Sequence, residues 1–445
     1  MKILSRKVLL PSVLCFLILI LLAVGCTTVE GIGDYNRGRL SGDGESSDSG
    51  VFQTATPPTS PDLRGEVFPV VLFVPTSSGY AQSVESIHAG VLDGVKYIND
   101  RGGVNGAEIN LLVVDLPDNP EEILKLVTNT LDKTDPLLVL MAAQVDELLY
   151  YEINHQAVPF LYYGIGGARF DPPTNQTEML FWLTPTSDEQ LSFFVRSLWA
   201  NWETIRPAGA YNELKVGFLE DANGLPDKFI DEEIIRLGGD NFAVPVRWAV
   251  PSSPNASVTN FLIDAVQNGV TVIYSDTPST GTAVLLNDIG SLALEDTFLV
   301  GGSIWSMDAG ISQHLLTGRN EKGYMVPFST AWWTEEANPA IQIAANIHNG
   351  AGRPESMRDA GYLIGLGSIE LVRTVFQASV SQLKSGDFSS EDVYQQLNRL
   401  EEYELMGGLF TVDYSNGRRS PTQMRLWQFE GNHGWKPVSE WGEVP

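Results

Sequence analysis

Cysteine is almost absent from this chain. Its 445 residues contain two, Cys15 and Cys26. Cys15 lies inside an N-terminal apolar stretch that we expect to be removed, so the mature chain would hold no pair to oxidise. Disulfides and cysteine-ligated metals are therefore excluded from the expected structure. A protein that folds outside the cytosol without disulfides depends on a large core, and a chain of this length can build one, in two lobes.

Basic residues are also scarce. The sequence has 28 lysines and arginines against 55 aspartates and glutamates, which gives a formal charge of -27. Removal of residues 1–25 lowers this charge to -30, because it takes away three cations and no anion. An acidic chain of this kind is a poor partner for nucleic acid, so no nucleic-acid role is expected. The acidity favours solubility and self-repulsion and says little about a ligand.

The common catalytic and metal-binding motifs are missing. The histidines are scattered, without an HExxH motif or a cysteine partner, and no G-x-S-x-G sequence occurs; they are His88, His155, His314, His348 and His433. Paired acids such as Glu121 with Glu122 fall on expected helices, where a solvated face explains them. The sequence therefore predicts that the protein is not an enzyme and needs no cofactor or metal.

The N-terminus has the layout of a secretory signal. Lys2, Arg6 and Lys7 precede a largely apolar run over 8–24, which is short for a membrane span of about 20 residues. Small residues come directly before Cys26, and this site resembles the lipobox of bacterial lipoproteins, although Ala23 stands where leucine is commoner. We therefore expect a signal peptide over residues 1–25 and lipidation of Cys26. An uncleaved anchor helix is the alternative.

Residues 26–66 are rich in glycine, serine, aspartate, threonine and proline, as in "GDGESSDSG" and "TATPPTSPD". Such a composition has too few branched apolar residues to bury a core, so the segment is predicted to be an unfolded tether.

From residue 67 the sequence alternates between strand and helix patterns. Short continuous apolar runs are typical of strands buried on both faces, and the segments between them carry apolar residues at helical spacing. Strands are expected at 67–75, 109–115, 136–143, 158–164, 214–221, 243–250, 270–276, 297–303 and 322–329, and a terminal hairpin and strand over 409–419 and 424–438. Helices are expected at 83–100, 121–133, 144–157, 225–239, 258–269, 282–294, 338–350 and 359–379. Glycines after Arg101 should end the first helix and reverse the chain with positive φ. The fold class is α/β, doubly wound.

The stretch "GVKYINDRGGVNGAEINLLVVDLPDNPEE", from Gly94 to Glu122, resembles the type I periplasmic solute-binding proteins of ABC transporters, specifically the branched-chain amino-acid (leucine-binding) receptor family. Weaker agreements are "VPFL" at Val158, "PTSDEQ" at Pro185, "EKGYMVPF" at Glu321 and "VDYSNGRR" at Val412. The resemblance covers nearly the whole body, from about 68 to 438.

This resemblance implies two parallel-sheet lobes joined by three hinge crossings, with residues 67–184 and 328–406 in lobe I and residues 185–327 and 407–445 in lobe II. The ligand would lie between the lobes, at the carboxyl ends of the strands. The implied role is an extracytoplasmic lipoprotein, monomeric and held at the membrane by its N-terminal lipid. It would capture a small solute and deliver it to ABC permease subunits. A membrane-tethered sensor or regulator with the same fold is the alternative.

The strand-end rule selects the loops 76–80, 116–118, 142–144, 162–167, 221–224, 275–277 and 303–305. At three of these places the chain departs from amino-acid receptors of the family. Ala143 and Gln144 stand where those receptors have hydroxyls that hold the ligand carboxylate. Ile304 and Trp305 stand where they have an acid that pairs with the ligand ammonium, and Asn223 stands where many have a tyrosine. Because an unpaired zwitterion is costly to desolvate, a standard α-amino acid is not expected as ligand.

Aromatic residues stand where those groups are missing, and they suit an apolar, aromatic or cationic solute. The predicted ligand-binding residues are Ser78, Tyr80, Gln144, Tyr163, Gly166, Asn223, Asp276, Trp305 and Trp332. Three alternatives stay open: the aromatic residues pack in the core, the glycines only form turns, and Asp276 and Gln144 are surface residues.

Overall fold

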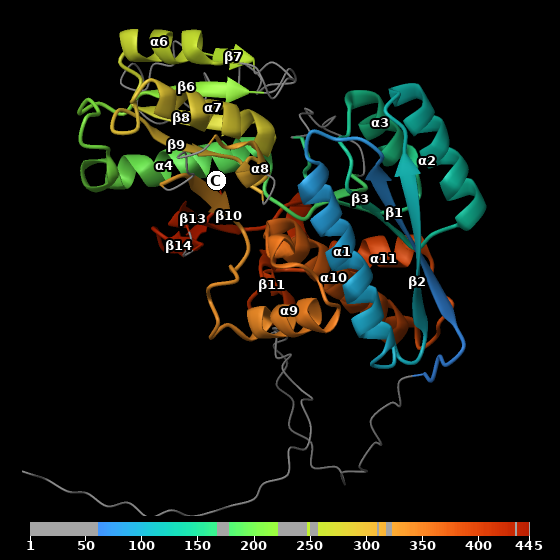
Figure 1. Cartoon of the computed structure of the whole chain (residues 1–445). Coiled ribbons are helices and arrows are strands. Elements are labelled where there is room, and N and C mark those ends of the chain that lie inside the picture. Colours follow the sequence, from blue (N-terminus) through green and yellow to red (C-terminus); the bar gives the residue numbers. More distant parts are fainter. Residues whose placement is uncertain are drawn as a thin grey trace, which may run out of the picture. The chain divides into compact units, whose positions relative to one another are not determined.

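Two β-sheets organise the chain in the computed structural model (Figure 1). The structure describes residues 61–166, 178–220, 247–249, 257–308, 311–316, 323–431 and 434–444. The predicted signal peptide, Cys26 and most of the tether lie outside these ranges, and so do Asn223 and the helix expected over 225–239. Both sheets belong to one compact unit that extends from Pro58 to Pro445.

The first sheet has five parallel strands in the order β2-β1-β3-β4-β5. These strands are β1 (Val67–Pro75), β2 (Glu108–Leu116), β3 (Leu138–Met141), β4 (Phe160–Tyr162) and β5 (Leu180–Trp182). Alternate residues of β1 belong to two different core clusters, Val70 and Leu72 to one and Val71 and Phe73 to the other. The sheet is therefore covered on both faces, which explains why its strands read as continuous apolar runs.

The second sheet has the order β14-β13-β10-β9-β8-β6-β7, with β15 paired to β13. Its members are β6 (Val216–Glu220), β7 (Arg247–Ala249), β8 (Val272–Asp276), β9 (Leu299–Gly302), β10 (Met325–Phe328), β13 (Gln423–Phe429), β14 (Trp435–Pro437) and β15 (Gly442–Glu443). The strands from β7 to β10 run parallel, whereas β13 is antiparallel to β10, β14 and β15. A short separate pair joins β11 (Tyr403–Glu404) to β12 (Thr411–Val412).

Helices pack on both faces of each sheet. With the first sheet we group α1 (Ala81–Asn99), α2 (Pro120–Thr134), α3 (Glu147–His155), α9 (Pro339–Gly350), α10 (Ala360–Leu383) and α11 (Ser390–Leu397), and we call this group lobe I. With the second sheet we group α4 (Ser187–Ile205), α6 (Thr259–Gln267), α7 (Ser279–Ser291) and α8 (Ile311–His314), and we call this group lobe II. Three-residue 3₁₀ turns occur at Glu355–Met357, Leu405–Gly407 and Ser415–Gly417.

The chain passes between the two lobes three times, through residues 183–186, 329–338 and 413–422. The prediction of a doubly wound α/β fold with two parallel-sheet lobes and three crossings is confirmed. The residue limits given above for the lobes stay a prediction.

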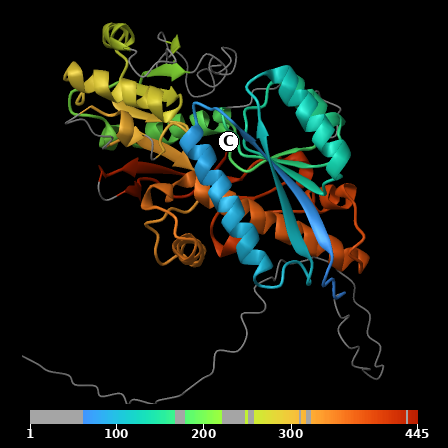
Figure 2. The same cartoon turned by 45° about the vertical axis from the view of Figure 1, so that its right-hand side comes forward.

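Helices α1 and α10 lie side by side because glycines let their backbones approach (Figures 1 and 2). A Cβ at Gly90 of α1 would lie 2.3 Å from the carbonyl oxygen of Tyr362, and one at Gly365 of α10 would lie 2.4 Å from that of Ile87. By length and composition α10 could also cross a membrane, but 72% of its most apolar window is buried inside the protein. It is therefore a core helix of lobe I.

The glycine-rich turn between α1 and β2 is built as the sequence predicts. Gly102, Gly103 and Gly106 have φ values of 96°, 62° and 101°. Asn99, the last residue of α1, closes the turn, since its side chain accepts a hydrogen bond from Ile109 N and donates one to Ile109 O, both at 2.9 Å. The Ile-Asn and Gly-Gly pattern thus fixes the entry of β2.

The fold differs from the sequence prediction in several places. Strand β5 and helices α4, α8 and α11 were not predicted. Only two residues of the segment 409–419 form a strand, and they pair with β11, because Asn416 and Gly417 turn the chain with φ values of 53° and 81°. The terminal hairpin consists instead of β13 and β14.

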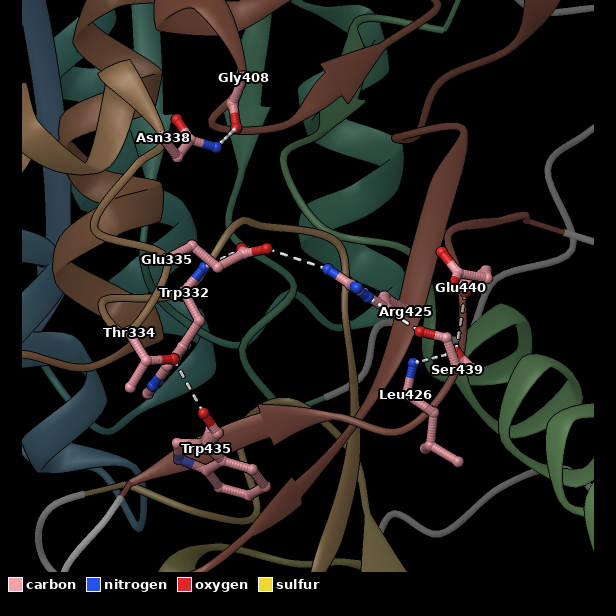
Figure 3. A network of polar contacts seen from close by, with 10 residues as sticks. All are labelled: Trp332, Thr334, Glu335, Asn338, Gly408, Arg425, Leu426, Trp435, Ser439 and Glu440. Atoms are coloured by element: carbon pink, nitrogen blue, oxygen red, sulfur yellow. Dashed lines mark hydrogen bonds and ion pairs between the residues drawn. The ribbon is translucent and has the colours of Figure 1, made fainter. Parts of the chain in front are cut away.

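A polar network ties the second crossing to the terminal hairpin (Figure 3). Glu335 accepts a hydrogen bond from Arg425 Nη1 at 2.9 Å and another from the backbone N–H of Trp332 at 3.0 Å. Thr334 Oγ1 donates to the carbonyl of Trp435 at 2.9 Å. These bonds hold the crossing 329–338 against lobe II, next to the ends of its central strands.

Candidate functional site

The two lobes touch where α1 begins. Ser83 Oγ in lobe I donates a hydrogen bond to Asp308 Oδ2, which follows β9 in lobe II, at 2.9 Å. A Cβ on Gly79 would lie 2.9 Å from Pro278, which follows β8. Tyr80, the residue before α1, is buried in the same region of the chain. The start of α1 therefore meets the carboxyl-terminal edge of the lobe II sheet, and we call this region the lobe contact.

The central strands of lobe II end next to one another at this edge. Ser275 of β8 is in register with Gly302 of β9, and Gly301 is in register with Met325 of β10. Parallel neighbours lie about 4.8 Å apart. Residues at the carboxyl ends of these three strands, including Asp276, Ser303 and Ser329, are therefore brought together.

Four buried polar side chains follow β9 and β10 without a hydrogen-bond partner among the described residues. Their unpaired atoms are Ser303 Oγ, Trp305 Nε1, Ser329 Oγ and Thr330 Oγ1. Their exposed fractions are 2%, 3%, 1% and 0%, in the same order. An unpaired buried donor costs about 1–3 kcal/mol, so four close along two adjacent strand ends need an explanation.

Neighbouring hydroxyls in the same sheet are paired. Ser275 Oγ lies 2.8 Å from Thr277 Oγ1, and Ser306 Oγ lies 2.8 Å from the hydroxyl of Tyr324. Burial raises the pKa of Tyr324, so its hydroxyl stays protonated. The unpaired group is therefore distinct from a satisfied network directly beside it.

Of the residues predicted in lobe I, Tyr80 lies at the lobe contact. Ser78 Oγ accepts a hydrogen bond from the backbone N–H of Tyr80 at 3.0 Å. Gln144 is exposed and donates weakly to the carbonyl of Gly166, with 3.4 Å between Nε2 and O. Gly166 has a φ of 72°, so its turn requires glycine.

Tyr163 does not join this group. It is fully buried, and its hydroxyl lies 2.7 Å from Ser368 Oγ of α10, inside lobe I. Burial raises its pKa. The geometry thus gives Tyr163 a packing role, since its polar end is already satisfied within one lobe.

In lobe II, Asp276 at the end of β8 and Trp305 after β9 are both buried, and their role in binding stays a prediction. Trp332 instead stacks on Phe328 with ring centroids 4.7 Å apart and packs edge-on against Trp435. It therefore packs where the second crossing meets the terminal hairpin, close to the polar network of Figure 3. Ser329 and Thr330 were not predicted as site residues, although they form a polar pair directly after the apolar strand 325–328.

Metal chemistry has no visible support in the part of the chain that the structure describes, where no group of three or more His, Cys, Asp or Glu side chains could hold an ion. A surface groove of about 420 Å³ lies between the C-terminal half of α4 and residues 212–214. Exposed side chains such as Trp199 and Glu203 line this groove, and no lobe I residue contributes to it.

The periplasmic binding protein family matches residues 68–434 of the sequence. The chain therefore belongs to this family, as the resemblance of its glycine turn predicts. No protein of curated function matches the sequence significantly.

Solved structures share the fold at low identity. A branched chain amino acid ABC transporter protein from Thermus thermophilus, with bound valine, is 18% identical with a TM-score of 0.70, covering 85% of this chain and 97% of that one. LivJ from Streptococcus pneumoniae, in complex with isoleucine, is 13% identical with a TM-score of 0.64, and the coverage is 84% and 100%. A solute-binding protein from Rhodopseudomonas palustris BisB5, with 3,4-dihydroxybenzoic acid, is 15% identical with a TM-score of 0.64, and the coverage is 85% and 98%.

Members of this family are extracytoplasmic solute-binding receptors of ABC transporters rather than enzymes.

Proposed function

We propose that this protein captures a small solute at the lobe contact and delivers it to the permease subunits of an ABC importer. The observation that carries the proposal is the set of buried, unpaired donors on Ser303, Trp305, Ser329 and Thr330 within the described chain. Four such groups are costly in an empty protein, but they become favourable when a ligand supplies the acceptors.

The solute is not a standard α-amino acid in this proposal. Ala143 and Gln144 offer no hydroxyl after β3, and Ile304 and Trp305 offer no carboxylate directly after β9. Tyr80 and Trp305 add flat aromatic surface with polar tips, which suits a planar solute with hydrogen-bond acceptors. The bound valine, isoleucine and dihydroxybenzoate belong to the similar structures and do not define this ligand.

The protein works, we propose, as a monomer anchored by a lipid on Cys26 at the outer face of the cytoplasmic membrane or in the periplasm. The basic and apolar N-terminal run and the small residues before Cys26 support this anchoring. Mass spectrometry of the mature N-terminus from membranes tests it. A Cys26→Ala chain that is cleaved and lipidated like the wild type would contradict it.

Solute capture is tested by thermal-shift screening of the purified chain against amides, aromatic acids, amino acids and short peptides, with native mass spectrometry for co-purified solutes. A true solute raises the melting temperature in proportion to the logarithm of its excess over the dissociation constant. We expect Ser303→Ala to abolish this shift while unliganded melting changes little. If no compound shifts the melting temperature and no solute co-purifies, the proposal fails.

Delivery is a separate step. Uptake of the identified solute by cells with and without the gene distinguishes an importer receptor from a tethered sensor. Unchanged uptake in the deletion strain would favour the sensor.

A further inference from the structure

Two buried carboxylates from different lobes lie against the first turns of α1. Asp308 of lobe II accepts the hydrogen bond from Ser83 Oγ. Asp359, which caps the start of α10 in lobe I, accepts one from Ser86 Oγ at 2.7 Å and one from Tyr362 N at 3.0 Å. Ser83 and Ser86 are three residues apart on α1, so both point to one side of that helix. The two carboxylates are only 8% and 7% exposed.

The cations near Asp359 are engaged elsewhere in the described structure. Arg353 forms a two-pronged ion pair with Asp93, with both N–O distances at 2.8 Å. The guanidinium of Arg358 lies over the Trp333 ring, 5.6 Å from its centroid, and pairs with Glu355 at 3.2 Å.

Three other side chains near Asp359 in the described part of the chain, those of Trp333, His348 and Tyr362, are uncharged at neutral pH. Trp333 Nε1 donates to the backbone carbonyl of Asp359, not to its carboxylate, at 3.1 Å. His348 packs edge-on against Tyr362 with ring centroids 5.1 Å apart. Burial lowers the pKa of His348, which therefore stays neutral, and the Tyr362 hydroxyl donates to Asp93.

Burial and, to a smaller extent, the negative charge of Asp308 raise the pKa of the Asp359 carboxyl to about 7, against the lowering effect of the hydrogen bonds from Ser86 and Tyr362. The second of these contributions comes from the opposite lobe. It is present only while Asp308 remains at the lobe contact.

We propose that closure of the two lobes, which places Asp308 at the lobe contact near Asp359, takes up a proton on Asp359, so that the solute is held more tightly below neutral pH than above it. This inference rests on the proposed function, because it assumes that the lobes open and close around a solute. The two carboxylates would then make solute binding depend on pH. Direct aromatic or hydroxyl contacts to the solute would not have this effect.

The sign follows from linkage. A carboxyl whose pKa is raised in the closed state binds more protons there than in the open state, so closure is favoured as the pH falls through about 7 and is lost as the pH rises. If all of the increase in pKa came from closure, the ratio of closed to open protein would change by about tenfold between pH 6 and pH 8. Part of the burial persists inside lobe I, so tenfold is the upper limit.

The test measures the distance between the lobes without added solute. Donor and acceptor dyes are attached at Leu148→Cys in lobe I and Ile263→Cys in lobe II, which are 66% and 44% exposed, in a full chain whose Cys15 and Cys26 are serine. Energy transfer is recorded from pH 5.5 to 8.5. We expect transfer to fall between pH 6 and pH 8 in this parent chain.

Asp359→Asn removes the titrating group and Asp308→Asn removes its partner, so each should flatten the pH profile. If Asp359→Asn fails to fold, Asp308→Asn decides alone. Asp100→Asn is the control and should keep the parent profile, because Asp100 is an exposed acid at the C-terminal end of α1, away from the lobe contact, and pairs with Lys96. A flat parent profile, or an unchanged profile in Asp308→Asn, overturns the inference.

The outcome is separable from that of the proposed function. A solute that binds equally at pH 6 and pH 8 leaves capture intact and refutes the proton linkage. A pH-dependent lobe distance in a protein that binds no solute supports the linkage and refutes capture.

Discussion

Thr330→Val tests whether the unpaired hydroxyls are reserved for a ligand. Thr330 Oγ1 is fully buried without a partner in the described residues, so its replacement by a methyl group of the same shape removes an unsatisfied donor and breaks no bond. We expect the free energy of unfolding to stay the same or to rise by about 1 kcal/mol.

Thr271→Val is the matched control. Thr271 is equally buried, but its hydroxyl accepts from Lys215 N at 2.9 Å and donates to Glu213 O at 3.0 Å. At about 1 kcal/mol for each bond, the control should lose about 2 kcal/mol. The two isosteric changes should therefore differ by about 2–3 kcal/mol.

Equilibrium unfolding in guanidinium chloride, without solute, measures both variants. The midpoint should move down for Thr271→Val and not for Thr330→Val, at an unchanged slope. With the solute identified by screening, Thr330→Val should lose most of its affinity and Thr271→Val should retain it. Equal destabilisation of the two variants would show that Thr330 already has a partner, and the reasoning for the site would be refuted.

Two further predictions concern the fold. Gly365→Ala places a methyl group 2.4 Å from the Ile87 carbonyl oxygen and should destabilise the protein by about 1–3 kcal/mol. The control is Gly350→Ala, at a helical glycine with open space around it, which should stabilise the protein by up to about 1 kcal/mol. Equal unfolding midpoints of the two variants in guanidinium chloride would contradict the close packing of α1 and α10. Asn99→Ala removes both hydrogen bonds to Ile109 and should cost about 2 kcal/mol, and Asn99→Asp, which replaces the donor by a second acceptor facing the Ile109 carbonyl, should also destabilise the protein. Wild-type stability of both variants in urea unfolding would show that these bonds do not hold the turn.

Much of the fold was readable because local signals agreed with tertiary structure. The apolar run 67–75 predicts a strand buried on both faces, and β1 contributes to two core clusters. The glycines after Arg101 predict positive φ, which the turn adopts. Such features depend on local backbone conformation and on burial alone, so the local sequence pattern predicts them.

The elements that were missed had weaker or overlooked signals. Helix α4 begins with a capping box, in which Thr186 accepts from Glu189 N and the Glu189 carboxylate accepts from Thr186 N. The letters "TSDE" carried this signal. Strand β5 has only three residues and becomes a strand by pairing with β4, which is a long-range contact that no local pattern expresses.

The site was only partly predictable for the same reason. The strand-end rule selects Asp276 and Trp305, because it needs only the order of strands. It does not show that Tyr163 finds Ser368 on α10, or that Trp332 stacks on Phe328, since both depend on helices packed from distant parts of the chain. Nor does it reveal which hydroxyls are left unpaired.

A structure of the purified protein with a solute identified by native mass spectrometry tests the central claim most directly. We expect the solute at the lobe contact, accepting hydrogen bonds from Ser303, Trp305 or Thr330 and lying against Tyr80. A solute bound only in the surface groove beside Trp199, or a lobe contact whose four donors are satisfied by the protein itself, would contradict the account.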